Sequence, residues 1–197
     1  LIDKGIIPDP VYAYNDECVR WVEKETWVYK CFFELSREDI KRDVKAIIFE
    51  GLDTYAKVYV NSSLVAVFDN MFIEHTLELA NVHEGKNELE MVFPPFSSIY
   101  SQKTLPEGFW INYSTERAYA RKAGYSFGWD WTPAVLTVGV WKKVRLVLAD
   151  KVDLVQLNVR AQLSDDLKTG HVMLLPELLG SLDPHFTYKT ELIKDGK

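Results

Sequence analysis

Short stretches in which apolar and polar residues alternate follow one another through the middle of the chain. Turn-forming residues separate them, as in Asn61-Ser62-Ser63 and Glu84-Gly85-Lys86-Asn87. Alternation with a period of two is typical of a strand that has one buried face and one wet face. The pattern predicts strands over residues 44–50, 56–60, 64–68, 73–79 and 88–93. Strands at such short, regular spacing indicate an all-β antiparallel sandwich.

The first residues have a different character. Residues 1–16 are predicted to form an irregular arm, because the prolines of Pro8-Asp9-Pro10 restrict the backbone. Asn15 is interpreted as the possible cap of a short helical turn that runs to Val22. A strand is predicted over residues 27–33, and the charged block 36–43 is predicted to be a solvated connection.

The alternation stops at residue 93 and returns near residue 139. Between these points, residues 116–122 favour a short helix, and the whole insertion leads to Gly124–Pro133. Long ordered loops in compact domains are more often functional than not. Strands are then predicted over residues 139–148, 152–163, 171–179 and 187–193. Too few residues follow position 150 for a complete second sandwich, so a fragment of a longer protein is expected.

The candidate chemistry lies in Trp129-Asp130-Trp131. Indole faces stack on the apolar face of a sugar ring, and a fixed carboxylate accepts hydrogen bonds from neighbouring hydroxyls. The same residues are also consistent with two core tryptophans and an aspartate that serves as a turn residue or helix cap. The loop alone leaves both interpretations open.

Composition narrows the class of protein. The chain has 197 residues, of which 47 % are apolar and 26 % are charged, an ordinary globular balance. The net charge of −6 without a basic run argues against a nucleic-acid partner, and neither a membrane span nor a signal peptide is expected. The two cysteines do not form a disulfide framework, and Cys31 is predicted to be a buried thiol. The scattered histidines predict no metal site, and no cofactor is expected.

Several segments resemble a known family. Residues 49–61, Asp69-Asn70-Met71-Phe72 and Gly85-Lys86-Asn87-Glu88-Leu89 resemble the domain that opens the glycoside hydrolase family 2 enzymes. The segments that resemble its β-mannosidase branch are Arg121-Lys122, Ser126-Phe127-Gly128-Trp129-Asp130-Trp131, Gly139-Val140-Trp141 and the early arm with Asn15, Trp21, Trp27 and Tyr29. The chain departs from the family at Thr132 and Ser62, where glycine is usual.

The resemblance implies a jelly-roll (galactose-binding-like) β-sandwich over residues 1–150 and the beginning of an immunoglobulin-like β-sandwich over residues 151–197. It also implies a retaining exo-β-mannosidase that releases terminal β-linked mannose. The two catalytic glutamates of such enzymes lie on a (β/α)₈ barrel, which is absent from this chain. Asn87-Glu88 imitates a catalytic dipeptide of the family, but its predicted strand position excludes that role. This chain is therefore expected to hold no catalytic residue and to be inactive alone.

By resemblance, Trp129 and Asp130 form one wall of a mannose pocket completed by the barrel domain. Asn15 is either a further polar contact or a helix cap, and Arg121 either steadies Asp130 or is solvated. Trp131 and Trp141 are assigned to packing.

Two other functions stay open: another family 2 specificity, of glucuronidase or glucosaminidase type, and a non-catalytic carbohydrate-binding sandwich. Asn61 and Asn112 fit the N-glycosylation pattern. The compartment is undecided, since family members are cytoplasmic, secreted or lysosomal.

Overall fold

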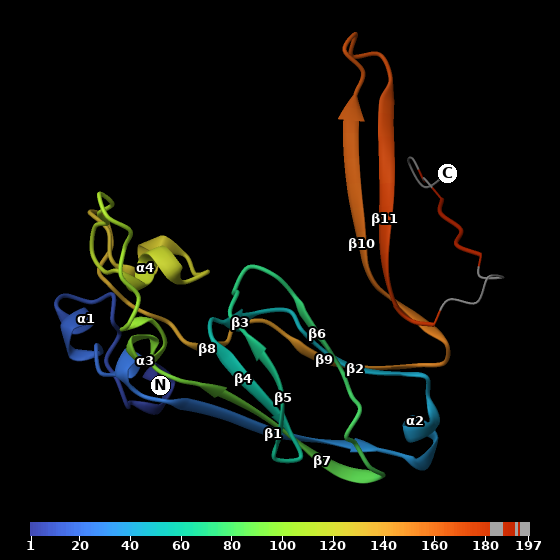
Figure 1. The fold of residues 1–197 in the computed structure, drawn as a ribbon, viewed down its shortest axis with the longest axis horizontal. Helices are drawn as coiled ribbons and strands as arrows, with labels where there is room; N and C mark the ends of the chain where they lie inside the picture. Colours follow the sequence, from blue (N-terminus) through green and yellow to red (C-terminus); the bar gives the residue numbers. More distant parts are fainter. Residues whose placement is uncertain (182–186, 192, 194–197) are drawn as a thin grey trace.

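The computed structural model describes residues 1–181, 187–191 and 193. Strands dominate it, and every strand pair is antiparallel. Figure 1 shows a sandwich of sheets, a set of short helices at one end and a long two-stranded ribbon at the other. The all-β prediction is confirmed.

The larger sheet has four strands in the order β1-β7-β4-β5. Its strands are β1 (Trp27–Leu35), β4 (Ala56–Val60), β5 (Ser63–Phe68) and β7 (Gly85–Phe93). In β7 the residues Leu89, Met91 and Phe93 are buried, whereas the alternating Glu88 and Glu90 face outward and pair with Lys30. The predicted alternation of buried and outward-facing residues in this strand is thus confirmed.

The facing layer is built around β2 (Val44–Phe49), which lies between β6 (His75–Glu78) and β9 (Val144–Ala149). Two short strands, β3 (Leu52–Asp53) and β8 (Gly139–Val140), form a separate pair. Side chains of β2 and β3, such as Phe49 and Leu52, pack against Val58 and Phe93 of the other sheet. Full burial of such a side chain contributes about 1.5–3 kcal/mol, so this cluster is the main source of stability.

The predicted single strand over residues 139–148 is wrong, because the chain breaks at residues 141–143. The break faces a matching interruption between β2 and β3, where Trp141 N donates to Gly51 O and Glu50 N donates to Lys143 O. A Cβ on Gly51 would lie 2.4 Å from the Trp141 indole nitrogen, so only glycine permits this approach. The two parts of the predicted strand therefore join different sheets: β8 pairs with β3, and β9 pairs with β2.

Short helices gather at one end of the sandwich (Figure 1). They are η1 (Ile2–Lys4), α1 (Asn15–Cys18), η2 (Val22–Lys24), α3 (Phe96–Tyr100), α4 (Glu116–Tyr119) and η3 (Gly124–Phe127). A small second core of Phe96, Tyr100 and Phe127 connects α3 to η3. The predicted short helix within residues 116–122 is confirmed, although it ends at Tyr119.

Beyond the sandwich, β10 (Val152–Leu163) and β11 (Gly170–Gly180) form a long ribbon. Its base contacts the sandwich, where Lys151 N donates to Asp43 Oδ2, next to β2, at 3.1 Å. These two strands were expected, but the third was not found: residues 187–191 and 193 form no strand, and residue 192 lies outside the described part. The division at position 150 and the immunoglobulin-like assignment stay predictions.

Two further expectations need a change. The charged block 36–43 is solvated, as expected, but it also contains helix α2 (Arg37–Lys41), which is stabilised by reciprocal hydrogen bonds between Ser36 and Asp39. Cys31 is exposed rather than buried, because β1 is the edge strand of its sheet. Cys18 and Cys31 are free thiols.

Within the described residues, no helix is long and apolar enough to cross a membrane. The same part of the chain holds no group of three or more His, Cys, Asp or Glu residues arranged to bind a metal ion.

Asn87 illustrates how a buried polar side chain stabilises this sandwich. It is 0 % exposed, its Nδ2 donates to the carbonyls of His83 and Gly85, and its Oδ1 accepts from Asn61 Nδ2 and His83 N. Asn87 therefore has a structural role in β7. This agrees with the exclusion of Asn87-Glu88 as a catalytic dipeptide.

We expect Asn87→Ala to lower the free energy of unfolding by about 1–3 kcal/mol, because it leaves buried donors and acceptors without partners. Urea denaturation of the 197-residue chain measures the change. Asn112→Ala, at an exposed position, is the control and should change stability by less than about 0.5 kcal/mol. Equal effects of the two substitutions would contradict the assignment.

Candidate functional site

The candidate loop ends in a tight hairpin. After η3, Gly128 adopts a φ of 100°, which favours glycine. Trp129 N then donates to Thr132 O at 3.0 Å, and Thr132 N donates to Trp129 O at 3.4 Å. Asp130 and Trp131 are therefore the two tip residues, and both are exposed. The turn interpretation of Asp130 is correct locally, and it leaves the carboxylate accessible to a ligand.

A buried ion pair lies at the base of this loop. Lys122 and Asp53 are 5 % and 3 % exposed, and Lys122 Nζ lies 2.6 Å from Asp53 Oδ1. The ammonium also donates to Thr137 O at 3.0 Å and to Thr137 Oγ1 at 2.9 Å. Thr137 Oγ1 in turn donates to Asp53 Oδ2 at 2.6 Å, and Thr54 Oγ1 donates to Asp53 Oδ1. One cluster thus joins the residues before and after the loop to strand β3.

Burial affects the charge of this cluster. Desolvation lowers the pKa of the Lys122 ammonium, and the adjacent Asp53 carboxylate acts in the opposite direction. The charged form of Lys122 therefore depends on Asp53. Removal of either partner would leave a buried charge uncompensated.

Trp129 is held between aromatic and cationic neighbours. Its ring is stacked on Tyr113 with a centroid separation of 5.7 Å, and the Arg117 guanidinium carbon lies 4.2 Å from its centroid. Arg117 in turn packs close to Gly124, where a Cβ would lie 3.1 Å from its Nε. With 40 % of its surface exposed, Trp129 is fixed in orientation while part of the indole stays open to solvent.

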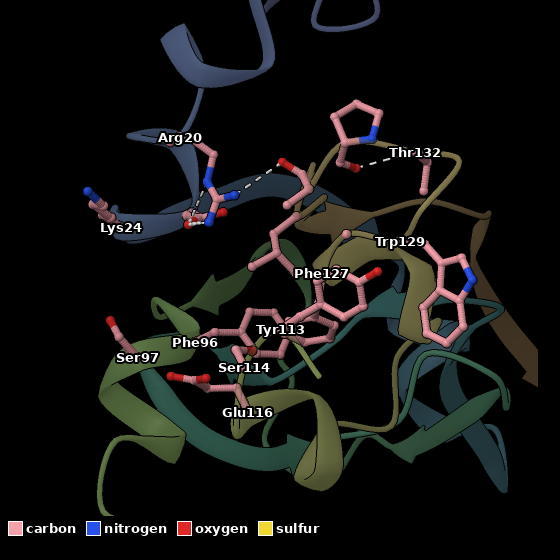
Figure 2. Close-up of a pocket in the computed structure, with 15 residues that line it drawn as sticks. Arg20, Lys24, Phe96, Ser97, Tyr113, Ser114, Glu116, Phe127, Trp129 and Thr132 are labelled. Carbon is pink, nitrogen blue, oxygen red and sulfur yellow. Dashed lines mark hydrogen bonds and ion pairs between the residues drawn. The ribbon is translucent and has the colours of Figure 1, made fainter. Parts of the chain in front are cut away.

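A hollow of about 650 Å³ lies between the loop and the segment around η2. Figure 2 shows Arg20 and Lys24 on one side of it and Trp129 on the opposite side. Its lining combines aromatic and charged residues, including Phe96, Tyr113, Phe127, Trp129, Arg20, Glu23, Lys24 and Glu116. Neither Asp130 nor Asn15 lines this hollow.

Asn15 and Arg121 do not join Asp130 through the contacts they make. Asn15 begins α1 and does not cap it, since Tyr14 holds the N-cap position and Asn15 Nδ2 donates to Asp9 O at 2.9 Å. Arg121 is exposed, and its side chain pairs with Asp69 at 3.8 Å. Arg121 is therefore a solvated residue and does not steady Asp130 through any of these contacts. A role for Asn15 toward a ligand stays a prediction.

The packing assignment is wrong for Trp131 and fits Trp141. Trp131 is 69 % exposed, with its ring tilted against Tyr125 at 5.8 Å, because it occupies the hairpin tip. Trp141 is half exposed, and its indole packs over Gly51. The hairpin therefore presents an aromatic ring on each side of Asp130.

Sequence reasoning missed the residues that hold the loop. Lys122 and Asp53 are 69 positions apart, and Thr137 is 84 positions from Asp53, so no local pattern brings them together. The predicted helix over residues 116–122 gives no sign that Arg117 packs against Trp129. The available signal is the basic pair Arg121-Lys122 directly before the loop.

The class of protein that the fold and the loop define is an all-β sandwich with a long aromatic loop at one end. The family model described as glycosyl hydrolase 2 galactose-binding domain-like matches residues 1–142. The chain therefore belongs to this glycosyl hydrolase 2 family.

The sequences of named relatives support the same family. Beta-mannosidase B of Emericella nidulans is 33 % identical over 148 residues, which cover 72 % of this chain and 17 % of that protein. Beta-mannosidase B of Thermothelomyces thermophilus is 36 % identical over 152 residues, with the same two coverages. The chain thus spans less than a fifth of the length of these relatives.

Solved structures show the same fold. Beta-D-mannosidase from Dictyoglomus thermophilum matches 91 % of this chain and 22 % of its own, with 33 % identity and a TM-score of 0.79. Exo-chitosanase from Amycolatopsis orientalis matches 91 % of this chain and 19 % of its own, with 20 % identity and a TM-score of 0.59. The second likeness carries information about the fold alone.

We expect the guanidinium of Arg117 to contribute measurably to the position of Trp129. A double-mutant cycle of Arg117→Gln and Trp129→Leu, read out as the free energy of unfolding, should give a coupling of about 0.5–1 kcal/mol. The matched cycle of Arg117→Gln with Trp131→Leu should give a coupling near zero. A Trp129 coupling no larger than the Trp131 coupling would contradict the contact.

Proposed function

We propose that this chain is the N-terminal part of a retaining exo-β-mannosidase that hydrolyses terminal β-D-mannose residues. In this proposal Trp129 and Asp130 supply one wall of the mannose pocket. The observation that carries it is the exposed hairpin with a carboxylate at its tip, in a chain whose relatives at 33–36 % identity are β-mannosidases.

The chemistry of the hairpin supports a sugar as ligand. The exposed Asp130 carboxylate is able to accept hydrogen bonds from two neighbouring hydroxyls, and such charge-assisted bonds are worth about 1.5–3 kcal/mol. Trp129 offers a partly open indole beside it, which Tyr113 and Arg117 hold in place. A fixed aromatic face and a carboxylate together match the apolar and hydroxyl-bearing sides of a pyranose.

The catalytic groups of the proposed enzyme are placed outside this chain. A retaining glycosidase needs two carboxyl groups about 5–5.5 Å apart, one as nucleophile and one as acid and base. In our proposal a (β/α)₈ barrel domain carries them and meets the hairpin. Asp130 then holds the distal hydroxyls of the terminal sugar, which closes the pocket beyond it and favours an exo mode of action.

In the complete enzyme, Asp130→Ala should lower kcat/KM on a β-mannoside by about two orders of magnitude, since the lost hydrogen bonds act on the bound sugar. Steady-state kinetics measures the change. Asp165→Ala, at the exposed turn of the ribbon, is the matched control and should leave kcat/KM unchanged. Activity of Asp130→Ala within a few-fold of wild type would remove Asp130 from the site.

The isolated 197-residue chain should bind a β-mannoside very weakly, because half of the pocket is missing. Calorimetric titration of this chain with mannose and manno-oligosaccharides measures the affinity. A tight, saturable signal would favour an independent carbohydrate-binding module instead. A panel of β-mannoside, β-glucuronide and β-glucosaminide substrates on the complete enzyme tests the specificity separately.

A further inference from the structure

Both ends of the loop that carries the hairpin are bound by one polar cluster, in which Lys122 and Asp53 are buried and Thr137 is exposed. Lys122 immediately precedes residues 123–136, and Thr137 immediately follows them. Lys122 Nζ bonds the carbonyl and the hydroxyl of Thr137, and both residues bond the Asp53 carboxylate of β3. We infer that Lys122, Thr137 and Asp53 are positioning residues that clamp the loop and set the place of Trp129 and Asp130. This inference rests on the proposed function.

The hydrogen bonding of the cluster is complete and directional. The Thr137 hydroxyl accepts from Lys122 and donates to Asp53, so it uses its single proton on the carboxylate. The Thr54 hydroxyl donates to the other carboxylate oxygen. Within the described residues, no buried side-chain nitrogen or oxygen lacks a partner. We call Lys122 and Thr137 the two stems of the loop. A fully satisfied polar cluster specifies one geometry, because any shift of a stem breaks several hydrogen bonds at once.

The neighbouring contacts connect the clamp to the hairpin. Directly before Lys122, the Arg121 carbonyl accepts from Met71 N at 3.1 Å, which ties this stem to the sandwich a second time. Further along the loop, Phe127 enters the small core with Phe96 and Tyr100. Beyond Phe127 the hairpin tip at Asp130 and Trp131 is exposed, while Trp129 is held by Tyr113 and Arg117. A displacement of the stems would therefore be transmitted to the hairpin through a short, packed segment.

A buried ion pair this deep is weak evidence for a stabilising role. Replacement of both members by neutral residues of similar size is often neutral or stabilising, whereas loss of one member is strongly destabilising. This difference separates a clamp from simple charge compensation. If the pair only compensates charge, a variant that is neutral at both positions should behave like wild type.

The test uses the complete enzyme with the double variant Asp53→Asn/Lys122→Met and the pair Thr137→Val and Thr137→Ser. Two quantities are measured: kcat/KM on a β-mannoside and amide hydrogen exchange of residues 123–136. We expect the double variant and Thr137→Val to raise the exchange and to lower kcat/KM by about ten- to a hundredfold, as small misplacements of binding groups do. Thr137→Ser retains the hydroxyl and should keep both quantities near wild type.

Val60→Ala controls for lost stability, because it opens a cavity in β4 opposite Leu89. If Val60→Ala lowers the melting temperature as much as Thr137→Val does, it should still leave the exchange of residues 123–136 and kcat/KM within twofold of wild type. Wild-type exchange and wild-type kcat/KM in Thr137→Val and the double variant would overturn the clamp. Raised exchange with unchanged kcat/KM would also overturn it, and the Asp130→Ala result then decides whether the proposed function fails with it.

Discussion

The contact between the Lys122 ammonium and the Asp53 carboxylate is the constraint on which the accessible end of this molecule depends. Both groups are buried, so each would be costly without the other. Their mutual attraction is accompanied by hydrogen bonds from Thr54 and to Thr137, which satisfy the remaining polar atoms. The pair therefore holds a solvent-exposed loop against the interior of the sandwich.

The rest of the architecture supports this arrangement. Two sheets with a shared apolar core give β3 a fixed place, and β3 brings Asp53 to the loop. A second, smaller core under α3 supports the segment that leads to the hairpin. At the hairpin itself, packing gives way to exposed aromatic rings on both sides of an exposed carboxylate. Burial thus decreases from the sandwich to the hairpin, the part that is proposed to meet a ligand.

Local patterns predicted most strands, because alternation in segments such as residues 56–60 and 88–93 is set by neighbours in sequence. They failed where the outcome depends on distant partners. The exposure of Cys31 follows from the edge position of β1, and the exposure of Trp131 follows from two backbone hydrogen bonds across the hairpin. Lys122 and Asp53, 69 positions apart, meet only in the folded chain. The family resemblance singled out Trp129 and Asp130 as candidates, but it did not indicate what holds them.

The short span between Lys122 and Thr137 has an evolutionary consequence. Because Lys122 and Thr137 both bond the Asp53 carboxylate, the two ends of the loop are attached to the sandwich independently of the residues at the hairpin tip. Residues 129–135 can then diverge in composition, or be exchanged as a cassette between related proteins, at little cost to the supporting domain, whereas Phe127 and Leu136 remain tied to the small core beside Phe96 and Tyr100. A scaffold of this kind allows new ligand preferences to arise by loop replacement, provided that the aspartate, the lysine and the threonine hydroxyl are inherited together.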